Sequence, residues 1–236
     1  MNLWDKKAKT YAKYNPKLNL IQEQSFKEFA NLKIEFKDKI LLDIACGTGV
    51  WSLHLARKVK KLIGVDSSKA MLEFLEQDAK KFKITNVQTY HLSFEDFLLQ
   101  NPNFSCDIVF LSMAAVLNSK KDYEAFMNLA PLRIYLGWQE FRQSDFLEPI
   151  FKHFDIKNKT KHEEDIESFL VQNHLSFSRF VFDETRKLTR SKEEALENAS
   201  WHLQMSGFNP PKKELEKLIS TSVNETISSK IKLLVF

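Results

Sequence analysis

The chain has 236 residues, of which 43% are hydrophobic and 28% are charged, a balance that is typical of globular proteins and excludes disordered and fibrous classes. The N-terminal residues contain no apolar run, and no stretch approaches the roughly 18 consecutive apolar residues of a membrane helix, so we expect neither a signal peptide nor a membrane anchor. The net charge is +4, and the basic runs at 57–61 and 80–83 fall near predicted helix ends, which disfavours a nucleic-acid groove. Cys46 and Cys106 lie in apolar, strand-like segments, which indicates a reducing cytoplasm.

The first half of the chain alternates short apolar runs with helical patterns, which is typical of a parallel sheet with crossover helices. Runs rich in β-branched and aromatic residues predict strands at 39–44, 61–65, 87–91, 107–111 and 132–137. Apolar residues at helical spacing predict helices at 49–58, 68–82 and 120–129. In the second of these helices, one stripe consists of Met71, Leu72, Leu75 and Ala79, a pattern that is typical of a face packed on a core.

The second half of the chain is more helical. We expect helices at 144–154 and 163–173, followed by an extended segment at 175–182. Thr189 or Ser191 can cap a helix at 191–205, because acidic residues follow closely. Pro210 and Pro211 open a further helix that runs to residue 219, and the last strand is expected at 231–236. No linker rich in Gly, Pro or Ser divides the chain, so we predict one domain over residues 1–236.

Two glycines, Gly47 and Gly49, directly follow the first predicted strand, where they let the backbone turn sharply and approach a ligand. Asp66 ends the second predicted strand, roughly 20 positions after Asp43, which is the spacing of a carboxylate that binds ribose hydroxyls. The dinucleotide pattern G-x-G-x-x-G fails, because Ser52 replaces its third glycine. Asp43 would repel a pyrophosphate but suits a cation. The loop therefore favours S-adenosylmethionine, which carries an ammonium and a sulfonium and has no phosphate.

The segment Asp43-Ile44-Ala45-Cys46-Gly47-Thr48-Gly49, together with Asp66, resembles the first two motifs of the class I S-adenosylmethionine-dependent methyltransferases. The order of strands and helices extends the resemblance over residues 36–140, and the likeness is to small bacterial members with uncharacterised substrates. It implies an α/β fold with a Rossmann-like sheet of seven mostly parallel strands, helices on both faces, and a helical insertion before the last strand.

The resemblance also implies roles for individual residues. In that family the loop backbone, here at Gly47 and Gly49, packs against the methionine moiety, Asp43 interacts with it, and Asp66 binds both ribose hydroxyls. Ser93 stands where the family usually has an acid that touches the adenine, and Phe94 would place its backbone amide and its side chain near the ring. The expected cofactor contacts are Asp43, Ala45, Cys46, Gly47, Gly49, Asp66, Ser67, Met71, Ser93, Phe94, Ser112 and Tyr11.

The acceptor side is less defined by the sequence. Met113 follows the fourth strand and Trp138 follows the fifth, at the edge where open α/β sheets bind ligands. If 175–182 and 231–236 are the sixth and seventh strands, the connection 183–230 is a helical insertion, and we expect it to roof the acceptor pocket. Its expected contacts are Trp201, His202 and Phe208, while burial of the sheet edge alone is the alternative.

We therefore expect methyl transfer from S-adenosylmethionine to a small molecule by in-line displacement that relies mainly on positioning. The domain would comprise an N-terminal helical cover at 1–35, a cofactor-binding core at 36–140 and the insertion at 183–230. In the N-terminal cover, Tyr11 or Tyr14 either covers the cofactor or packs on the sheet. No residue spacing indicates a metal site, and no catalytic base is assigned; His91 lies near the site by strand order. Two alternatives stay open: an RNA or protein methyltransferase, and a cofactor-binding module without catalysis.

Overall fold

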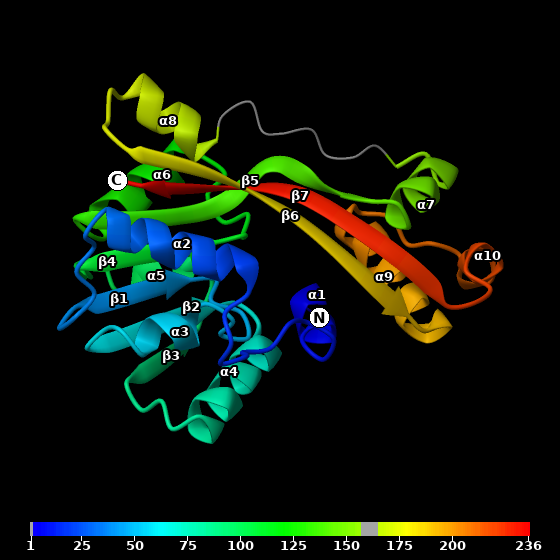
Figure 1. Ribbon diagram of the computed structural model, residues 1–236, viewed down its shortest axis with the longest axis horizontal. Coiled ribbons are helices and arrows are strands. Elements are labelled where there is room, and N and C mark those ends of the chain that lie inside the picture. The colour runs from blue at the N-terminus through cyan, green and yellow to red at the C-terminus, as the bar shows by residue number, and fades with distance from the viewer. Residues whose placement is uncertain (1, 157–164) are drawn as a thin grey trace. The chain divides into compact units, whose positions relative to one another are not determined.

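The computed structural model describes residues 2–156 and 165–236 (Figure 1). Within these residues one seven-stranded sheet has the order β3-β2-β1-β4-β5-β7-β6. The strands are β1 (Ile40–Ile44), β2 (Lys61–Asp66), β3 (Val87–His91), β4 (Ile108–Ser112), β5 (Leu132–Ser144), β6 (Ser178–Arg190) and β7 (Val223–Val235). The first five pair in parallel. The predicted Rossmann-like methyltransferase fold is confirmed.

The last strand runs against the others, as the red and green arrows show in Figure 1. Arg133 at the start of β5 and Phe236 after β7 exchange both backbone hydrogen bonds, at 2.8 and 3.1 Å, which is the pattern of an antiparallel pair. β7 lies between β5 and β6.

The described residues form two compact units. The core unit comprises the chain up to Gly137, residues 165–182 and Lys232–Phe236. The second unit comprises residues 138–156 and Asp183–Ile231, and so contains the later part of β5, most of β6 and most of β7.

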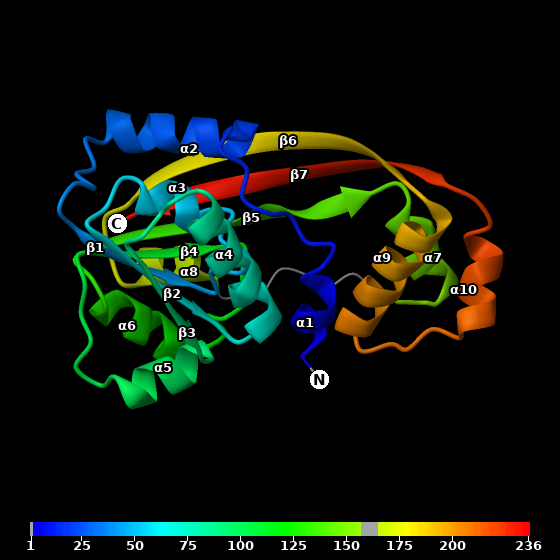
Figure 2. The same cartoon turned by 90° about the horizontal axis from the view of Figure 1, so that it is seen from below.

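The core unit has helices on both faces of its sheet (Figure 2). On one face, aromatic residues of three helices pack on β1, β2 and β4 in one buried cluster; these helices are α5 (Phe94–Gln100), α6 (Lys120–Asn128) and α8 (Ile166–Gln172). On the other face, the ring of Trp51 lies 5.4 Å from that of Phe110 in β4. The helices on this face are α2 (Leu20–Asn31), α3 (Ser52–Ala56) and α4 (Lys69–Lys81), and α1 (Leu3–Lys7) contacts α4.

The second unit contains α7 (Leu147–His153), α9 (Lys192–Met205) and α10 (Lys212–Leu218). Its own buried cluster joins these helices through Leu147, Ile150, Ala195, Ala199, Leu203, Leu215 and Ile219. Ser191 caps α9 in a capping box with Glu194, so Ser191 and not Thr189 is the cap. Pro211 precedes α10, as the sequence predicted.

Three strands are longer than predicted, because most of their additional residues are polar and no continuous apolar run marks them. β5 continues past Gly137 to Ser144, β6 ends at Arg190, and β7 begins at Val223. The connection between the last two strands is therefore 191–222, shorter than the 183–230 that the sequence suggested. The helix expected at 144–154 starts only at Leu147, because Ser144 ends the strand and its hydroxyl accepts from the Leu147 amide at 2.9 Å.

Helix boundaries also differ from the prediction. The helix expected at 49–58 is confined to α3, since the glycine turn occupies its first residues. α8 lies inside the segment expected at 163–173, of which residues 163 and 164 are outside the described residues. The helical cover expected at 1–35 contains α1 and α2, for which no individual bounds were predicted. α5 carries too few turns for a periodic pattern to show.

Candidate cofactor site

The turn after β1 is shaped by residues in the left-handed region of the backbone. Ala45, Gly47 and Gly49 have φ of +54°, +55° and +82°. A Cβ on Gly49 would lie 2.8 Å from Cγ of Leu75, so the close approach of this loop to α4 requires glycine. A Cβ on Gly47 would meet nothing within 4 Å, so the space in front of its backbone is open. The turn therefore presents an uncovered stretch of backbone at the carboxyl edge of β1.

Asp66, the last residue of β2, faces this turn. Its Oδ2 accepts from the Gly47 amide at 2.8 Å and its Oδ1 accepts from the Ser68 amide at 2.8 Å. The side chain is buried, and burial raises its pKa above the usual range, although both amides oppose this. Two donors thus hold a carboxylate in one orientation beside the open backbone of Gly47.

Asp43 lies one strand away in β1 and is only 2% exposed. The Ser52 hydroxyl donates to its Oδ2 at 2.5 Å. The pKa of Asp43 is raised to about 7: burial and, to a lesser extent, the neighbouring Asp66 raise it, while the Ser52 hydrogen bond lowers it. A buried acid next to a second acid gains most from a cation. This arrangement fits the ammonium group of S-adenosylmethionine and does not fit a pyrophosphate.

The N-terminal segment reaches the same region through contacts that sequence reasoning missed. The Asn2 amide donates to the Ser67 carbonyl at 2.9 Å, and Asp5 accepts from the Ser68 hydroxyl at 2.6 Å and from the Ala70 amide at 3.2 Å. Asp5 therefore sits at the N-terminus of α4, where a negative charge is favourable. More than sixty positions separate these partners in the chain, and no local sequence pattern carries such information.

Two further contacts tie the N-terminal segment to the glycine turn. The Thr48 hydroxyl donates to the Ala12 carbonyl, and Gln22 donates to the Val50 carbonyl at 2.9 Å. Tyr14 is buried, with its ring 4.7 Å from His54 and its hydroxyl accepting from Arg57, so it packs against the core unit. Tyr11 is 37% exposed and lies edge-on to Trp4. Of the two tyrosines, Tyr11 is the one with surface left for a ligand.

The residues expected near the adenine follow β3. Ser93 caps α5: its hydroxyl accepts from the Asp96 amide and donates to the Asp96 carboxylate at 2.6 Å. The Phe94 side chain is buried in the core cluster with α6 and α8, so only its backbone is available at the surface. The exposed His91 lies within 3.2 Å of the Ser67 carbonyl, beside Asp66.

Other expected contacts are largely buried. Met71 is 2% exposed and belongs to the packed face of α4. The sulfur of Cys46 packs closely against Gly64, so that a Cβ on Gly64 would lie only 2.9 Å from it. Burial raises the pKa of the Cys46 thiol well above its usual range, so this thiol stays protonated. The Asp107 carboxylate accepts from the Ile40 amide at 2.8 Å at the opposite edge of the sheet, which gives it a structural role.

The residues expected on the acceptor side fall in both units. In the core unit, Ser112 pairs with Leu136, and Met113 has φ of +53° and donates to the Leu136 carbonyl at 2.8 Å. In the second unit, the rings of Trp201 and His202 lie edge-to-face, 4.8 Å apart, and Trp138 begins the unit.

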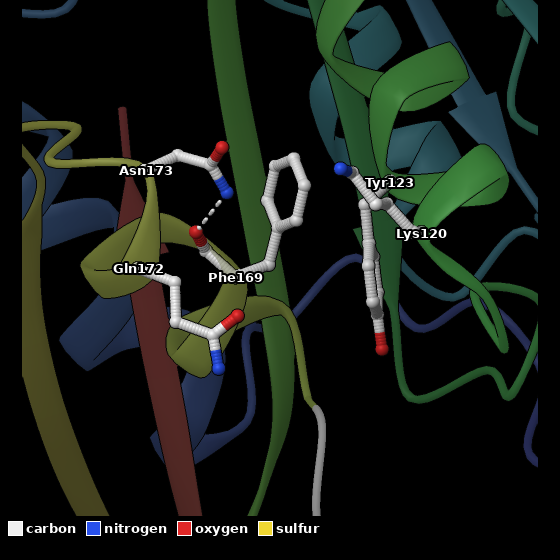
Figure 3. A pocket seen from close by; sticks show the side chains of 5 residues that line it. All are labelled: Lys120, Tyr123, Phe169, Gln172 and Asn173. Carbon is white, nitrogen blue, oxygen red and sulfur yellow. Dashed lines mark hydrogen bonds between the residues drawn. The ribbon is translucent and has the colours of Figure 1, made fainter.

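A separate pocket of about 270 Å³ lies between α6 and α8 in the core unit (Figure 3). The rings of Tyr123 and Phe169 stand 5.3 Å apart, and Asn173 donates to the Phe169 carbonyl. Lys120 and Gln172 complete its lining. None of the predicted cofactor contacts lines this pocket.

In the described ranges, no helix has the length and apolarity to span a bilayer, and no cluster of His, Cys, Asp or Glu could hold a metal ion.

Comparisons with known proteins agree with this geometry. A family model described as a methyltransferase domain matches residues 41–131. The 23S rRNA (uracil(1939)-C(5))-methyltransferase RlmD of Pectobacterium atrosepticum is 31% identical over 34% of this chain and 18% of its own length. Pavine N-methyltransferase of Thalictrum flavum is 30% identical over 40% of this chain and 26% of its own length. The chain thus spans less than half the length of the curated relatives it matches.

A solved structure supports the fold over nearly the whole chain. The YcgJ protein from Bacillus subtilis aligns with a TM-score of 0.55 and 15% identity, covering 90% of this chain and 98% of that one. Residues 41–131 thus match a methyltransferase domain, and the fold of the chain agrees with that match.

Proposed function

We propose that this chain transfers a methyl group from S-adenosylmethionine to a small molecule. One observation carries the proposal: two backbone amides fix the Asp66 carboxylate beside the open backbone of Gly47, while the buried Asp43 lies one strand away. In this proposal Asp66 binds the ribose hydroxyls, Asp43 interacts with the ammonium group, and Gly47 contacts the methionine moiety. Ala45, Cys46, Gly49, Ser67, Met71, Ser93, Phe94, Ser112 and Tyr11 complete the proposed contact set.

Positioning accounts for most of the chemistry in this proposal. The cofactor supplies a methyl group on a positive sulfur, so that the acceptor's electron pair forms the new bond to carbon while the carbon–sulfur pair returns to sulfur. The residues of the chain bind and orient the two reactants and exclude water. We assign no general base, and an acceptor that loses a proton passes it to solvent.

The acceptor is proposed to be recognised in part by the second unit. The proposed contacts in this unit are Trp201 and His202 on α9 and Trp138 on β5. An aromatic pair offers a flat apolar surface with one polar edge, which suits a small organic acceptor. Substitution of Trp201 by Ala is expected to raise the KM for the acceptor and to leave the Kd for S-adenosylmethionine unchanged.

A metabolite extract tests the proposal most directly. The protein is incubated with the extract and with methyl-labelled S-adenosylmethionine, and mass spectrometry identifies small products that gain one labelled methyl group. The Asp66→Asn variant is the matched control and is expected to lose the product. Binding of S-adenosylmethionine without any labelled product or labelled macromolecule would instead indicate a binding module without catalysis.

An RNA acceptor is the second candidate, because RlmD, a relative by sequence over 34% of this chain, is named for methylation of 23S rRNA. The basic residues of the present chain are balanced by acidic ones, 35 against 31, which favours the small molecule. Transfer of label to total RNA, together with a steep loss of RNA affinity with salt, would support the second candidate instead.

A further inference from the structure

Three arginines gather on one part of the second unit. Arg142 lies on β5, and Arg186 and Arg190 lie on β6. Alternate residues of a strand share a face, so Arg186 and Arg190 project on the same side of β6 together with Glu184. Glu225 of β7 contacts two of the arginines, which places the group around the middle strand of the three.

Glu225 is fully engaged in holding this group together. It is 1% exposed; its Oε2 accepts from Nε of Arg190 at 2.7 Å and its Oε1 accepts from the Ser144 hydroxyl at 2.6 Å. The same Ser144 hydroxyl accepts from the Leu147 amide at the start of α7. Glu225 thus connects three strands and, through Ser144, a helix.

Arg142 is underpaired by comparison. Its Nη2 lies 3.8 Å from Glu225, beyond hydrogen-bond distance. Among the residues that the structure describes, its buried Nε has no hydrogen-bond partner. Burial lowers the pKa of Arg142, and the next largest influence is the like charge of Arg186, ahead of the attraction of Glu225. A guanidinium with five donors in such surroundings gains from an added anion.

The charges of the group do not cancel. Three guanidinium groups face two carboxylates, Glu184 and Glu225. Arg186 pairs with Glu184 at 3.3 Å and remains 45% exposed, and the Arg142 side chain is 26% exposed. The excess positive charge is therefore accessible to a small solute.

We propose that Arg142, Arg186 and Arg190 form a binding site for an oxyanion, namely the carboxylate or phosphate group of a small molecule. Planar guanidinium groups bind both groups through paired hydrogen bonds, which is why arginine and not lysine is the expected residue here. The site lies wholly in the second unit and does not depend on the proposed methyl transfer.

Binding of the bare anions tests the proposal. Inorganic phosphate and sodium acetate are titrated separately into the ¹⁵N-labelled full chain at constant ionic strength, and the arginine Nε–H cross-peaks are followed by NMR. We expect the Arg142 and Arg186 cross-peaks to move in a saturable manner with at least one of the two anions, and the better anion identifies the preferred group. Shifts that are linear in concentration for both anions would overturn the proposal.

Matched variants distinguish binding at the three arginines from nonspecific attraction of the anion by positive charge. Arg142→Gln is expected to weaken anion binding tenfold or more, read on the Arg186 cross-peak. Lys187→Gln removes the same charge from the opposite face of β6 and is expected to change the Kd by less than twofold. If Arg142→Gln does not fold, Arg186→Gln, at a more exposed position, takes its place with the Arg142 cross-peak as readout. Equal losses in the arginine and lysine variants would contradict the proposal.

Two further measurements on the same samples keep the inference distinct from the proposed function. The Kd for S-adenosylmethionine is expected to be the same in the wild type and in Arg142→Gln, so a protein that binds no S-adenosylmethionine but does bind phosphate refutes only the proposed function. A twelve-nucleotide oligouridylate is added as a third ligand. Binding of this RNA more than a hundredfold tighter than phosphate, lost equally in Lys187→Gln, would show an extended nucleic-acid surface and overturn the small-molecule site.

Discussion

Asp43 and Asp66 place two carboxylates within one small region at the carboxyl edge of the sheet, and the protein stabilises them differently. Asp66 receives two backbone amides, whereas the fully buried Asp43 receives one hydroxyl from Ser52. Consequently the pKa of Asp43 rises to about 7, so near neutral pH this residue is divided between its neutral and charged forms. The free enzyme thus carries an electrostatic strain that a bound cation would relieve.

Substitution Asp43→Asn is therefore expected to stabilise the free protein at high pH. The pKa of Asp43 is above its ordinary value of 3.8, so the native state favours the protonated form. Its contribution to stability is complete below about pH 4, is lost as the pH rises, and is absent above about pH 7. Asparagine imitates the neutral acid and still accepts from Ser52. We expect a gain of about 2–4 kcal/mol at pH 8.5 and none at pH 4, measured by urea denaturation. Equal stability of the two proteins at pH 8.5 would contradict this assignment.

The same substitution is expected to weaken cofactor binding, which links stability to function at this residue. If the cofactor's ammonium binds the charged form of Asp43, affinity should rise with pH up to about 7 and level off above it. The slope should approach tenfold per pH unit. Calorimetric titration with S-adenosylmethionine between pH 5.5 and 8.5 measures this, and Asp43→Asn should bind weakly with a flat profile. A pH-dependence that persists in Asp43→Asn would assign it to another group.

For Asp66, substitution by Asn is expected to weaken S-adenosylmethionine binding tenfold or more, because hydrogen bonds to a charged acceptor are worth about 1.5–3 kcal/mol each. Asn retains one acceptor for the Gly47 or Ser68 amide, so the fold is better preserved than in Asp66→Ala. The matched control is Asp107→Asn, which alters a carboxylate at the opposite edge of the sheet and should leave the Kd unchanged. An unaltered Kd in Asp66→Asn would place the ribose elsewhere.

At the scale of elements, the sequence predicted the bounds of a helix or strand well where neighbouring residues determine them, and poorly where contacts between distant residues determine them. β3 was predicted to the residue and α4 to within one residue at each end, because β-branched and aromatic residues mark Val87–His91 and Ser68 caps a periodic stripe. β6 and β7 were predicted too short, since residues such as Arg190 and Glu225 extend them through pairing across strands. The Asp43, Gly47 and Gly49 loop followed from a local motif, whereas the Asp5 contact to Ser68 needed the tertiary fold.

That contact leads to a prediction for α1, whose position depends on a few polar bonds to the start of α4. Asp5→Ala removes the acceptor for the Ser68 hydroxyl and the Ala70 amide, at a cost of about 1 kcal/mol. Hydrogen exchange should become faster at the amides of Ala8 and Tyr11, which bond back to α1. Lys6→Ala, at an exposed position of the same helix, is the control. No difference between the two variants would mean that contacts other than those of Asp5 hold α1.

At the scale of the whole molecule, each unit has its own buried cluster, and the proposed function divides the work between them. The proposed cofactor contacts all belong to the core unit, and most proposed acceptor contacts belong to the second. If this division holds, damage to one unit's core should impair one kind of binding and spare the other. Leu203 of α9 and Leu75 of α4 are both 0% exposed, so they offer a matched pair of substitutions.

Each leucine-to-alanine change should cost about 2–5 kcal/mol of stability through the cavity it leaves. Leu75→Ala should also raise the Kd for S-adenosylmethionine severalfold, because Leu75 supports the turn at Gly49. Leu203→Ala should leave that Kd unchanged at temperatures where the protein stays folded, while it lowers turnover of the acceptor identified from the extract. Calorimetric titration and turnover on both variants measure the two effects. If Leu203→Ala weakened cofactor binding as much as Leu75→Ala does, the two units would share the cofactor site, and the division proposed here would be wrong.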